Sequence, residues 1–458
     1  MKKKIGMLLA LLMSAMLVFG VVGCGQTIQD DPNTLYIWTA DLDASYESNL
    51  DLNPNNPTAL FTKELVEGFE KSHPGKTVSL LFNGWGEELN GNMMKLIGSQ
   101  NSIKVDLIPG EEYMPRYVQG GVYTPIELDD ITSDMVDSIA NEGVYEGETY
   151  AIPTSTGTFA LYVNHTVLKE AGILNEDGTV NEIYSDLNPL EPATWEDLLA
   201  ICEVVKQYYE SRNVSDHGGM AISGTKTGSH WRALAFMRTA GGDFADEEGN
   251  VTFDSQANRK AFNMMKDLVA TGPDGITGIS DEDKVIQYFV DNKAAYILDG
   301  GTILNKPIDK STYSLSELPV FEDVGIKSGV ATGTVYYSIW GRSTKKDLAL
   351  EFLRYWLSPE MQKRQLELTN RLSARTSVMS DESIHTEQYN WWANEKLVAP
   401  LIEPEYVNVK MLPCFINNPS HIWSEWQQFF SGVIAGNGTV ENSIAATQSA
   451  MAKWAAQE

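Results

Sequence analysis

Aromatic and acidic side chains gather in three short stretches, each directly after an apolar run. Trp85 lies between two glycines in "FNGWGEE", and the other two stretches carry Asp41, Asp43, Glu111, Glu112 and Tyr113. An aromatic ring packs against weakly apolar C–H groups, and a carboxylate accepts hydrogen bonds from hydroxyl groups. A Trp between glycines has little core to fill, which favours stacking against a ligand. Neighbouring carboxylates usually diverge, so we expect at most one of Glu111 and Glu112 to face that ligand.

The apolar runs before these stretches predict three strands, "TLYIW" (34–38), "TVSLLF" (77–82) and "KVDLIPG" (104–110). We expect the second to be buried. Amphipathic helical patterns separate the strands, which predicts right-handed βαβ units and a parallel sheet. Ligands of such sheets bind beyond the carboxyl ends of the strands. The polar and aromatic residues above therefore fall along one edge of the predicted sheet.

The N-terminus has the pattern of an export signal, with three lysines followed by an apolar run from Ile5 to Val22. "VVGC" resembles the lipobox of bacterial lipoproteins, which implies cleavage of residues 1–23 and a lipid on Cys24, followed by a polar tether over 24–31. Acyl chains would then hold the protein at a lipid bilayer on the outer side of the cell membrane. An ordinary signal peptide and a retained membrane anchor remain alternatives.

Composition indicates a folded protein with an acidic surface. The chain has 458 residues and 43% hydrophobic residues, enough for two or three domains. Its formal net charge is −28; without the three N-terminal lysines, 31 basic residues face 62 acidic ones, a net charge of about −31. Such a surface repels nucleic acid. We therefore expect no nucleic-acid partner.

The remaining cysteines and the acidic clusters do not predict a metal or a cofactor. Cys202 lies at a helical spacing of apolar residues that begins with a Thr194–Asp197 capping box, so we expect a buried thiol and no disulfide with Cys414. Cysteines and histidines lack zinc spacing. The acidic stretch around Asp246 lacks the EF-hand spacing and predicts a solvated hairpin turn.

Six passages in the mature part of the chain resemble one protein family. They are "FEKSHPGKTVSLLF", "KVDLIPG", "YEGETYAIPTSTGTFALYVNHTVLKEAGI", "PATWEDLLAICEVV", "FVDNKAAYILDGG" and "YYSIWGRSTKKDLALEFLRYWLSPEMQ". In this order, and behind a lipobox, they resemble the extracellular solute-binding lipoproteins of bacterial ATP-binding-cassette (ABC) importers. The resemblance is to the carbohydrate-binding group that includes maltodextrin-binding proteins.

The resemblance implies an α/β fold of the periplasmic-binding-protein type, with two lobes, a hinge and a ligand cleft between the lobes. The chain of such proteins crosses between the lobes several times. Transferred to this sequence, lobe 1 covers 31–153 plus 294–331, and lobe 2 covers 154–293 plus 332–458. Hinge bending closes the lobes over the ligand, and a membrane permease recognises the closed form.

The resemblance also adds ligand-contacting candidates, which are Trp231, Asp299, Tyr336, Arg375 and Trp423. Asp299 matches a family position that lines the cleft. Gly301 and Thr302 follow where the family often has an aromatic residue, so a stacking platform there is in doubt.

The function implied is delivery of a mono- or oligosaccharide to the permease subunits of an ABC importer by a monomeric binding protein that is not an enzyme. The same fold could hold a polyamine, a metal or a peptide instead. A surface glycoside hydrolase remains open as well, because two carboxylates across a cleft would suffice for that chemistry. The sequence contains no H-E-x-x-H, G-x-S-x-G or Walker motif. An adhesive surface protein without an importer is the last alternative.

Overall fold

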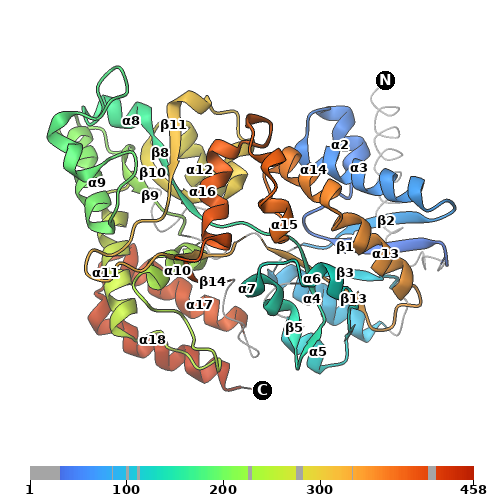
Figure 1. Ribbon diagram of the computed structural model, residues 1–458. Coiled ribbons are helices and arrows are strands. Elements are labelled where there is room, and N and C mark those ends of the chain that lie inside the picture. Colours follow the sequence, from blue (N-terminus) through green and yellow to red (C-terminus); the bar gives the residue numbers. More distant parts are fainter. Residues whose placement is uncertain are drawn as a thin grey trace, which may run out of the picture.

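The computed structural model describes residues 31–84, 86–99, 103–110, 114–224, 229–274, 282–332, 334–410 and 419–457. They form two α/β lobes that lie side by side (Figure 1). Lobe 1 contains the N-terminal strand, and lobe 2 contains the C-terminal helix.

Lobe 1 is built on a six-stranded sheet. Its strand order is β2 (Thr77–Phe82), β1 (Thr34–Thr39), β3 (Leu107–Gly110), β13 (Val335–Trp340) and β4 (Tyr123–Thr124), with β7 (Ile152–Ser155) also paired to β13. Strand β1 is parallel to both β2 and β3, whereas β13 is antiparallel to its neighbours. The predicted parallel βαβ arrangement of the first three strands is confirmed.

The prediction that strand 77–82 is buried is wrong. Within the described sheet, β2 pairs with β1 alone and forms an edge. Leu81 is 53% exposed and Phe82 55% exposed. An edge strand lies at the margin of the layers that pack on the faces of a sheet, so its side chains can stay open to solvent. An apolar run therefore does not by itself indicate a central position.

Helices cover both faces of this sheet. Helix α3 buries Phe61, Leu65 and Phe69, begins with an Asn56 cap and ends at Ser72, just before Pro74 and Gly75, which do not continue a helix. The helices of lobe 1 are α2 (Tyr46–Leu52), α3 (Pro57–Ser72), α4 (Gly86–Gly98), α5 (Met114–Gln119), α6 (Asp129–Thr132), α7 (Asp137–Ala140), α13 (Lys346–Trp356), α14 (Pro359–Thr369) and α15 (Thr376–Met379). A small hairpin joins β5 (Val144–Tyr145) to β6 (Glu148–Thr149).

Lobe 2 is built on a four-stranded sheet in the order β11 (Tyr313–Ser316), β8 (Ala160–Asn164), β10 (Ala294–Asp299) and β9 (Gly218–Ala221). Its helices are α8 (His165–Glu170), α9 (Trp195–Glu210), α10 (Ser229–Thr239), α11 (Gln256–Ala270), α12 (Glu282–Val290), α16 (Trp391–Ile402), α17 (Pro419–Phe429) and α18 (Val440–Ala455). Helix α9 begins with the predicted Thr194–Asp197 capping box, and Cys202 is a buried free thiol, as expected. Cys414 lies outside the described residues.

The strand pairing differs from the expected division of the chain into lobes. Strands β10 and β11 both pair with β8, so residues 294–316 belong to lobe 2 and not to lobe 1. Conversely, β13 joins the sheet of lobe 1, and α14 packs against α3. The six passages fix the order of segments along the chain, but hydrogen bonding between distant strands decides which sheet each one joins.

The chain crosses between the lobes next to β7, next to β13 and between α15 and α16 (Figure 1). Isolated bridges join the crossing segments, Thr156 to Leu372 and Thr158 to Ala331. A short parallel sheet of β12 (Ser328–Val330) and β14 (Val407–Lys410) lies beside them. The crossing region is therefore held by backbone hydrogen bonds between segments far apart in sequence.

Two buried apolar clusters stabilise the molecule. One fills lobe 1 and continues through Ala331, Leu372 and Leu397 to one face of the four-stranded sheet. The other packs the opposite face of that sheet against α9, α10, α11 and α17. Since the first cluster includes residues of both lobes, the lobes share apolar contacts beside the crossings.

The predicted acidic hairpin turn is present, where Ala245 bridges Val251 and Asp246 accepts a hydrogen bond from the backbone of Asn250. Asp243, just before the turn, forms an ion pair with Arg238. In the described part of the chain, no helix is both long and apolar enough to cross a bilayer.

Candidate ligand-binding site

Asp41 lies just beyond the carboxyl end of β1, at the predicted binding edge of lobe 1. Its Oδ1 accepts hydrogen bonds from the Tyr337 hydroxyl at 2.6 Å and the Thr39 hydroxyl at 3.3 Å. The Arg371 guanidinium lies 3.9 Å from Oδ2. Asp41 is thus a buried carboxylate held by neutral donors, with a partly exposed cation beside it.

The other predicted residues of this edge differ in their placement. Asp43 accepts hydrogen bonds from the Ser45 backbone and the Asn49 side chain, both at 2.8 Å, and so fixes the turn before α2. Trp85, Glu111, Glu112 and Tyr113 lie outside the described residues. Their roles stay predictions.

Asn83 joins the lobe 1 edge at the end of β2. Its backbone N–H donates to the Thr39 carbonyl at 2.9 Å, which places it next to the end of β1. Its side-chain oxygen accepts from Asn92 at 2.7 Å, while its buried Nδ2 has no partner among the described residues. A buried donor without an acceptor is costly, so this position suits an additional acceptor.

Three consecutive residues of α10 organise the candidate site of lobe 2. Helix α10 is buried on almost every side, and Arg232 within it is 1% exposed. The Arg232 guanidinium donates to the Asp299 carboxylate at 2.8 Å and to the Leu298 carbonyl at 3.1 Å. A charge buried this deeply requires a partner, and Asp299 at the end of β10 supplies it.

Burial raises the pKa of Asp299 to about 6, because desolvation penalises the carboxylate more than the Arg232 cation stabilises it. The partly exposed Glu282 adds to this, since its carboxylate lies 3.6 Å from Arg232 and repels that of Asp299. The backbone N–H of Gly300 donates to Asp299 at 2.7 Å. The hydrogen-bonding capacity of Asp299 is therefore largely taken up within the chain.

The two predicted tryptophans of lobe 2 flank this group. Trp231 is partly buried and packs against both apolar clusters. The Trp423 ring stacks on His230 with centroids 4.6 Å apart and lies edge-on to Phe244 at 5.4 Å. Trp423 is 7% exposed. His230 and Arg232, on either side of Trp231, thus contact Trp423 and Asp299 respectively.

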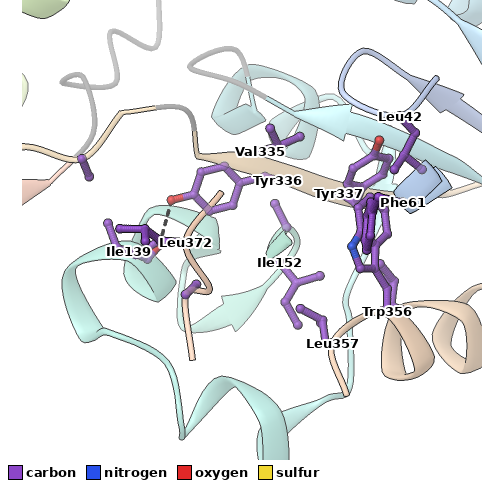
Figure 2. Packing of buried hydrophobic residues seen from close by; sticks show 14 of the residues in the cluster. Leu42, Phe61, Ile139, Ile152, Val335, Tyr336, Tyr337, Trp356, Leu357 and Leu372 are labelled. Atoms are coloured by element: carbon purple, nitrogen blue, oxygen red, sulfur yellow. Dashed lines mark hydrogen bonds between the residues drawn. The ribbon is translucent and has the colours of Figure 1, made fainter. Parts of the chain in front are cut away.

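Tyr336 and Arg375 are not part of either group. The buried Tyr336 hydroxyl donates to the Ile139 carbonyl at 2.8 Å, on the opposite side of β13 from Tyr337 (Figure 2). Arg375 donates to Asp134 at 2.8 Å and to the Leu357 carbonyl at 2.7 Å. Both side chains connect elements of lobe 1 to each other.

The sequence analysis did not identify Arg232, Arg371 or Tyr337. A signal was present for Arg232, because "WRALAFM" places one cation in an otherwise apolar helix, where it must be paired. Tyr337 could be placed only once the antiparallel pairing of β13 with β3 was known. Arg371 follows the end of α14, and nothing in its neighbourhood in the sequence connects it to Asp41.

A metal site finds no support in the part of the chain that the structure describes. It contains no group of three or more His, Cys, Asp or Glu side chains placed to hold an ion. Two pairs of adjacent tyrosines, Tyr336–Tyr337 and Tyr208–Tyr209, could suggest an iron site, but neither pair is suitably placed. Tyr336 and Tyr337 point in opposite directions (Figure 2), and the Tyr209 hydroxyl donates to Glu170 at 2.6 Å.

The arrangement of two α/β lobes joined by several crossings defines a two-lobed solute-binding fold. Solved structures share it. The GacH receptor of Streptomyces glaucescens, solved unliganded and with acarbose, matches with a TM-score of 0.70 at 20% identity, over 92% of this chain and 98% of that one. Maltose-bound MalE3 of T. maritima matches with a TM-score of 0.69 at 17% identity, over 92% and 98%. The chain belongs to the family of bacterial extracellular solute-binding proteins, whose model matches residues 64–396.

Curated relatives are somewhat more similar in sequence but are matched over only part of their length. The arabinooligosaccharide-binding protein of Halalkalibacterium halodurans is 25% identical over 310 residues, which are 64% of this chain and 63% of that protein. The lactose-binding protein of Rhizobium radiobacter is 22% identical over 351 residues, 71% of this chain and 74% of that protein. Three putative binding proteins from Brucella match over 51% of their length. These relatives are described as binding proteins, not as enzymes.

Proposed function

We propose that this protein binds a mono- or oligosaccharide between its lobes and delivers it to an ABC importer by hinge closure. The family match supports the class of protein. Relatives that bind arabinooligosaccharide and lactose, and fold neighbours solved with acarbose and maltose, support a carbohydrate ligand.

The observation that carries the proposal is the Trp231–Arg232–Asp299 group at the start of α10. An incompletely buried indole directly precedes, in the same helix, the arginine that is fixed by Asp299. A sugar presents C–H faces that pack on such a ring and hydroxyl groups that bond to polar side chains lining a cleft. Asp41 and Asn83 would supply polar contacts from lobe 1. Asp43, Tyr336, Arg375 and Trp423 stay predictions as ligand contacts.

The N-terminal segment completes the proposal. Cleavage after residue 23 and a lipid on Cys24 would tether the protein through residues 24–31 at the outer face of the membrane. The family is extracellular, which agrees with this placement. Mass spectrometry of the membrane fraction would test it, since the wild type should carry a lipid on an N-terminal Cys24 and Cys24→Ser should abolish that lipid.

A thermal-shift panel of mono- and oligosaccharides on residues 25–458 tests the ligand class. A sugar at 100 times its Kd should add about 2.7 kcal/mol of stability. Trp231→Ala should weaken binding at least tenfold. Trp392→Ala, which removes a 37% exposed indole of α16, is the matched control and should bind like the wild type.

Other outcomes would replace the proposal with one of the alternatives. Stabilisation by a polyamine, a metal ion or a peptide but by no sugar would retain the fold and change the ligand. Release of reducing sugar from an oligosaccharide would indicate a glycoside hydrolase. No shift with any small molecule would favour an adhesive surface protein.

A further inference from the structure

Four asparagine side chains meet where the two lobes touch beside the chain crossings. Asn370 ends α14 in lobe 1, Asn305 ends the turn Gly301–Asn305 that follows β10, and Asn390 and Asn394 lie at the start of α16, which packs on β11. We call these four residues the asparagine cluster. Its members come from both lobes and from three separate parts of the sequence.

Direct hydrogen bonds connect the asparagine cluster across the lobes. Asn370 Nδ2 donates to Asn305 Oδ1 at 2.7 Å, and Asn305 Nδ2 donates back to the Thr369 carbonyl at 2.8 Å. Asn390 Nδ2 donates to Asn370 Oδ1 at 2.9 Å. Asn370 therefore bonds to two different segments of lobe 2 through one side chain.

The packing around Asn370 leaves little room for displacement. A Cβ atom on Gly301 would lie 2.5 Å from the Asn370 carbonyl oxygen, so the two backbones meet without a side chain between them. Asn394 Oδ1 is fully buried and has no donor among the described residues. The Nδ2 of the same Asn394 side chain lies 3.5 Å from Asn370 Oδ1, so this free acceptor is next to the bonds of the cluster. The cluster could thus exchange partners if the lobes shifted.

The asparagine cluster is next to the candidate binding edge of lobe 1. Arg371 directly follows Asn370, and its guanidinium lies 3.9 Å from the Asp41 carboxylate. A ligand that binds to Asp41 therefore acts on Arg371, and a peptide bond joins Arg371 to Asn370 of the cluster. This gives a short covalent and electrostatic connection between the binding edge and the contact of the lobes.

We propose that the asparagine cluster is a latch between the lobes, which fixes their relative orientation and thereby sets the affinity for the ligand. This inference rests on the proposed function for its effect on affinity. Apparent affinity scales with the fraction of molecules in the binding-competent arrangement. The hydrogen bonds of the asparagine cluster stabilise one arrangement of the lobes, so their removal changes the fraction of molecules in the binding-competent arrangement.

Two substitutions remove the latch from opposite sides with little risk to folding. Asn370 has a φ of +53°, a conformation that glycine adopts freely, so Asn370→Gly removes the side-chain bonds and keeps the backbone. Asn305→Ala acts from the other lobe at an exposed position. Asn213→Gly is the matched control, because Asn213 is exposed with a φ of +58°.

The test measures the sugar Kd by calorimetry and the radius of gyration of the unliganded protein by small-angle scattering. Asn370→Gly and Asn305→Ala should each change the Kd at least threefold, in the same direction, with a matching change in the radius of gyration. The effects of the two substitutions should not add fully in the double variant, because both remove the bond between Asn370 and Asn305. Asn213→Gly should change neither quantity.

Variants with a wild-type radius of gyration and a wild-type Kd would overturn the latch. A wild-type protein that binds no sugar would overturn the proposed function instead. In that case scattering of the unliganded variants still decides on the latch, since the orientation of the lobes in the unliganded protein is measured without any ligand.

Discussion

Two arginine–carboxylate pairs with the same bond length behave differently in the two lobes. In lobe 2, Arg232 lies 2.8 Å from Asp299, and in lobe 1, Arg375 lies 2.8 Å from Asp134. Burial raises the pKa of Asp299 to about 6. Partial burial would raise the pKa of Asp134 too, but hydrogen bonds from Ser377 and Arg375 outweigh it and lower that pKa below the usual 3.8.

The surroundings of the two pairs explain the difference. The side chains of the Arg232–Asp299 pair are 1% and 2% exposed, whereas those of the Arg375–Asp134 pair are 14% and 23% exposed. Ser377 gives Asp134 two further donors, its backbone N–H and its hydroxyl. Solvent access and neutral donors, and not the N–O distance, therefore decide whether the pKa of each carboxylate is raised or lowered. The buried pair in the candidate site is the costlier one to disturb.

The largest expected effect is the loss of Arg232. Arg232→Met leaves Asp299 buried without its cation, so the free energy of unfolding from urea titration at pH 7.5 should fall by about 3–5 kcal/mol. The double variant Arg232→Met/Asp299→Leu should recover much of this loss, because it removes the uncompensated charge as well.

Arg354→Met is the control for losing a cation in general. Arg354 pairs with the exposed Asp130 at the surface, and its removal should leave the urea midpoint unchanged. A small effect of Arg232→Met, similar to that of Arg354→Met, would show that Asp299 does not depend on its partner.

The next effect is a pair of pH dependences with opposite signs. Between about pH 4 and pH 6, native Asp299 binds more protons than the unfolded chain, so this group's contribution to stability should fall as pH rises. Native Asp134 binds fewer, so its contribution should be complete above its usual pKa of 3.8 and be lost as pH falls through its lower native pKa.

The free energy of unfolding is measured from pH 3 to 7 for the wild type, Asp299→Asn and Asp134→Asn. Subtracting the value of each variant from that of the wild type isolates the contribution of each carboxylate. Differences that change with pH in the same direction for both residues would contradict the comparison.

The sequence predicted what depends on local patterns. Helix α9 with its capping box, the buried Cys202 and the first three parallel strands follow from apolar spacing and cap residues that are neighbours in the chain. The family resemblance supplied the two-lobed fold, because six ordered passages span most of the mature chain.

The sequence could not predict what depends on partners distant in the chain. The exposure of Phe82 follows from an edge position, and the membership of β10 in lobe 2 follows from its pairing with β8. Asp299 was identified, but its partner Arg232 is 67 residues away. The sequence does not show that Tyr337, and not its neighbour Tyr336, donates to Asp41. Alternation along a strand places neighbours on opposite faces, and only the pairing shows which face matters.

The smallest expected effect separates a structural arginine from a ligand contact. Arg375→Met removes charged hydrogen bonds to Asp134 and Leu357 that are partly open to solvent. The free energy of unfolding from urea titration should therefore be about 1–2 kcal/mol lower than in the wild type. The sequence places Arg375 among the ligand contacts, whereas its bonds within lobe 1 occupy its guanidinium. We therefore expect a sugar Kd within twofold of the wild type, measured by calorimetry. A tenfold weaker Kd with unchanged stability would instead assign Arg375 to the ligand, and the lobe 1 pair would then share the functional role of the pair in lobe 2.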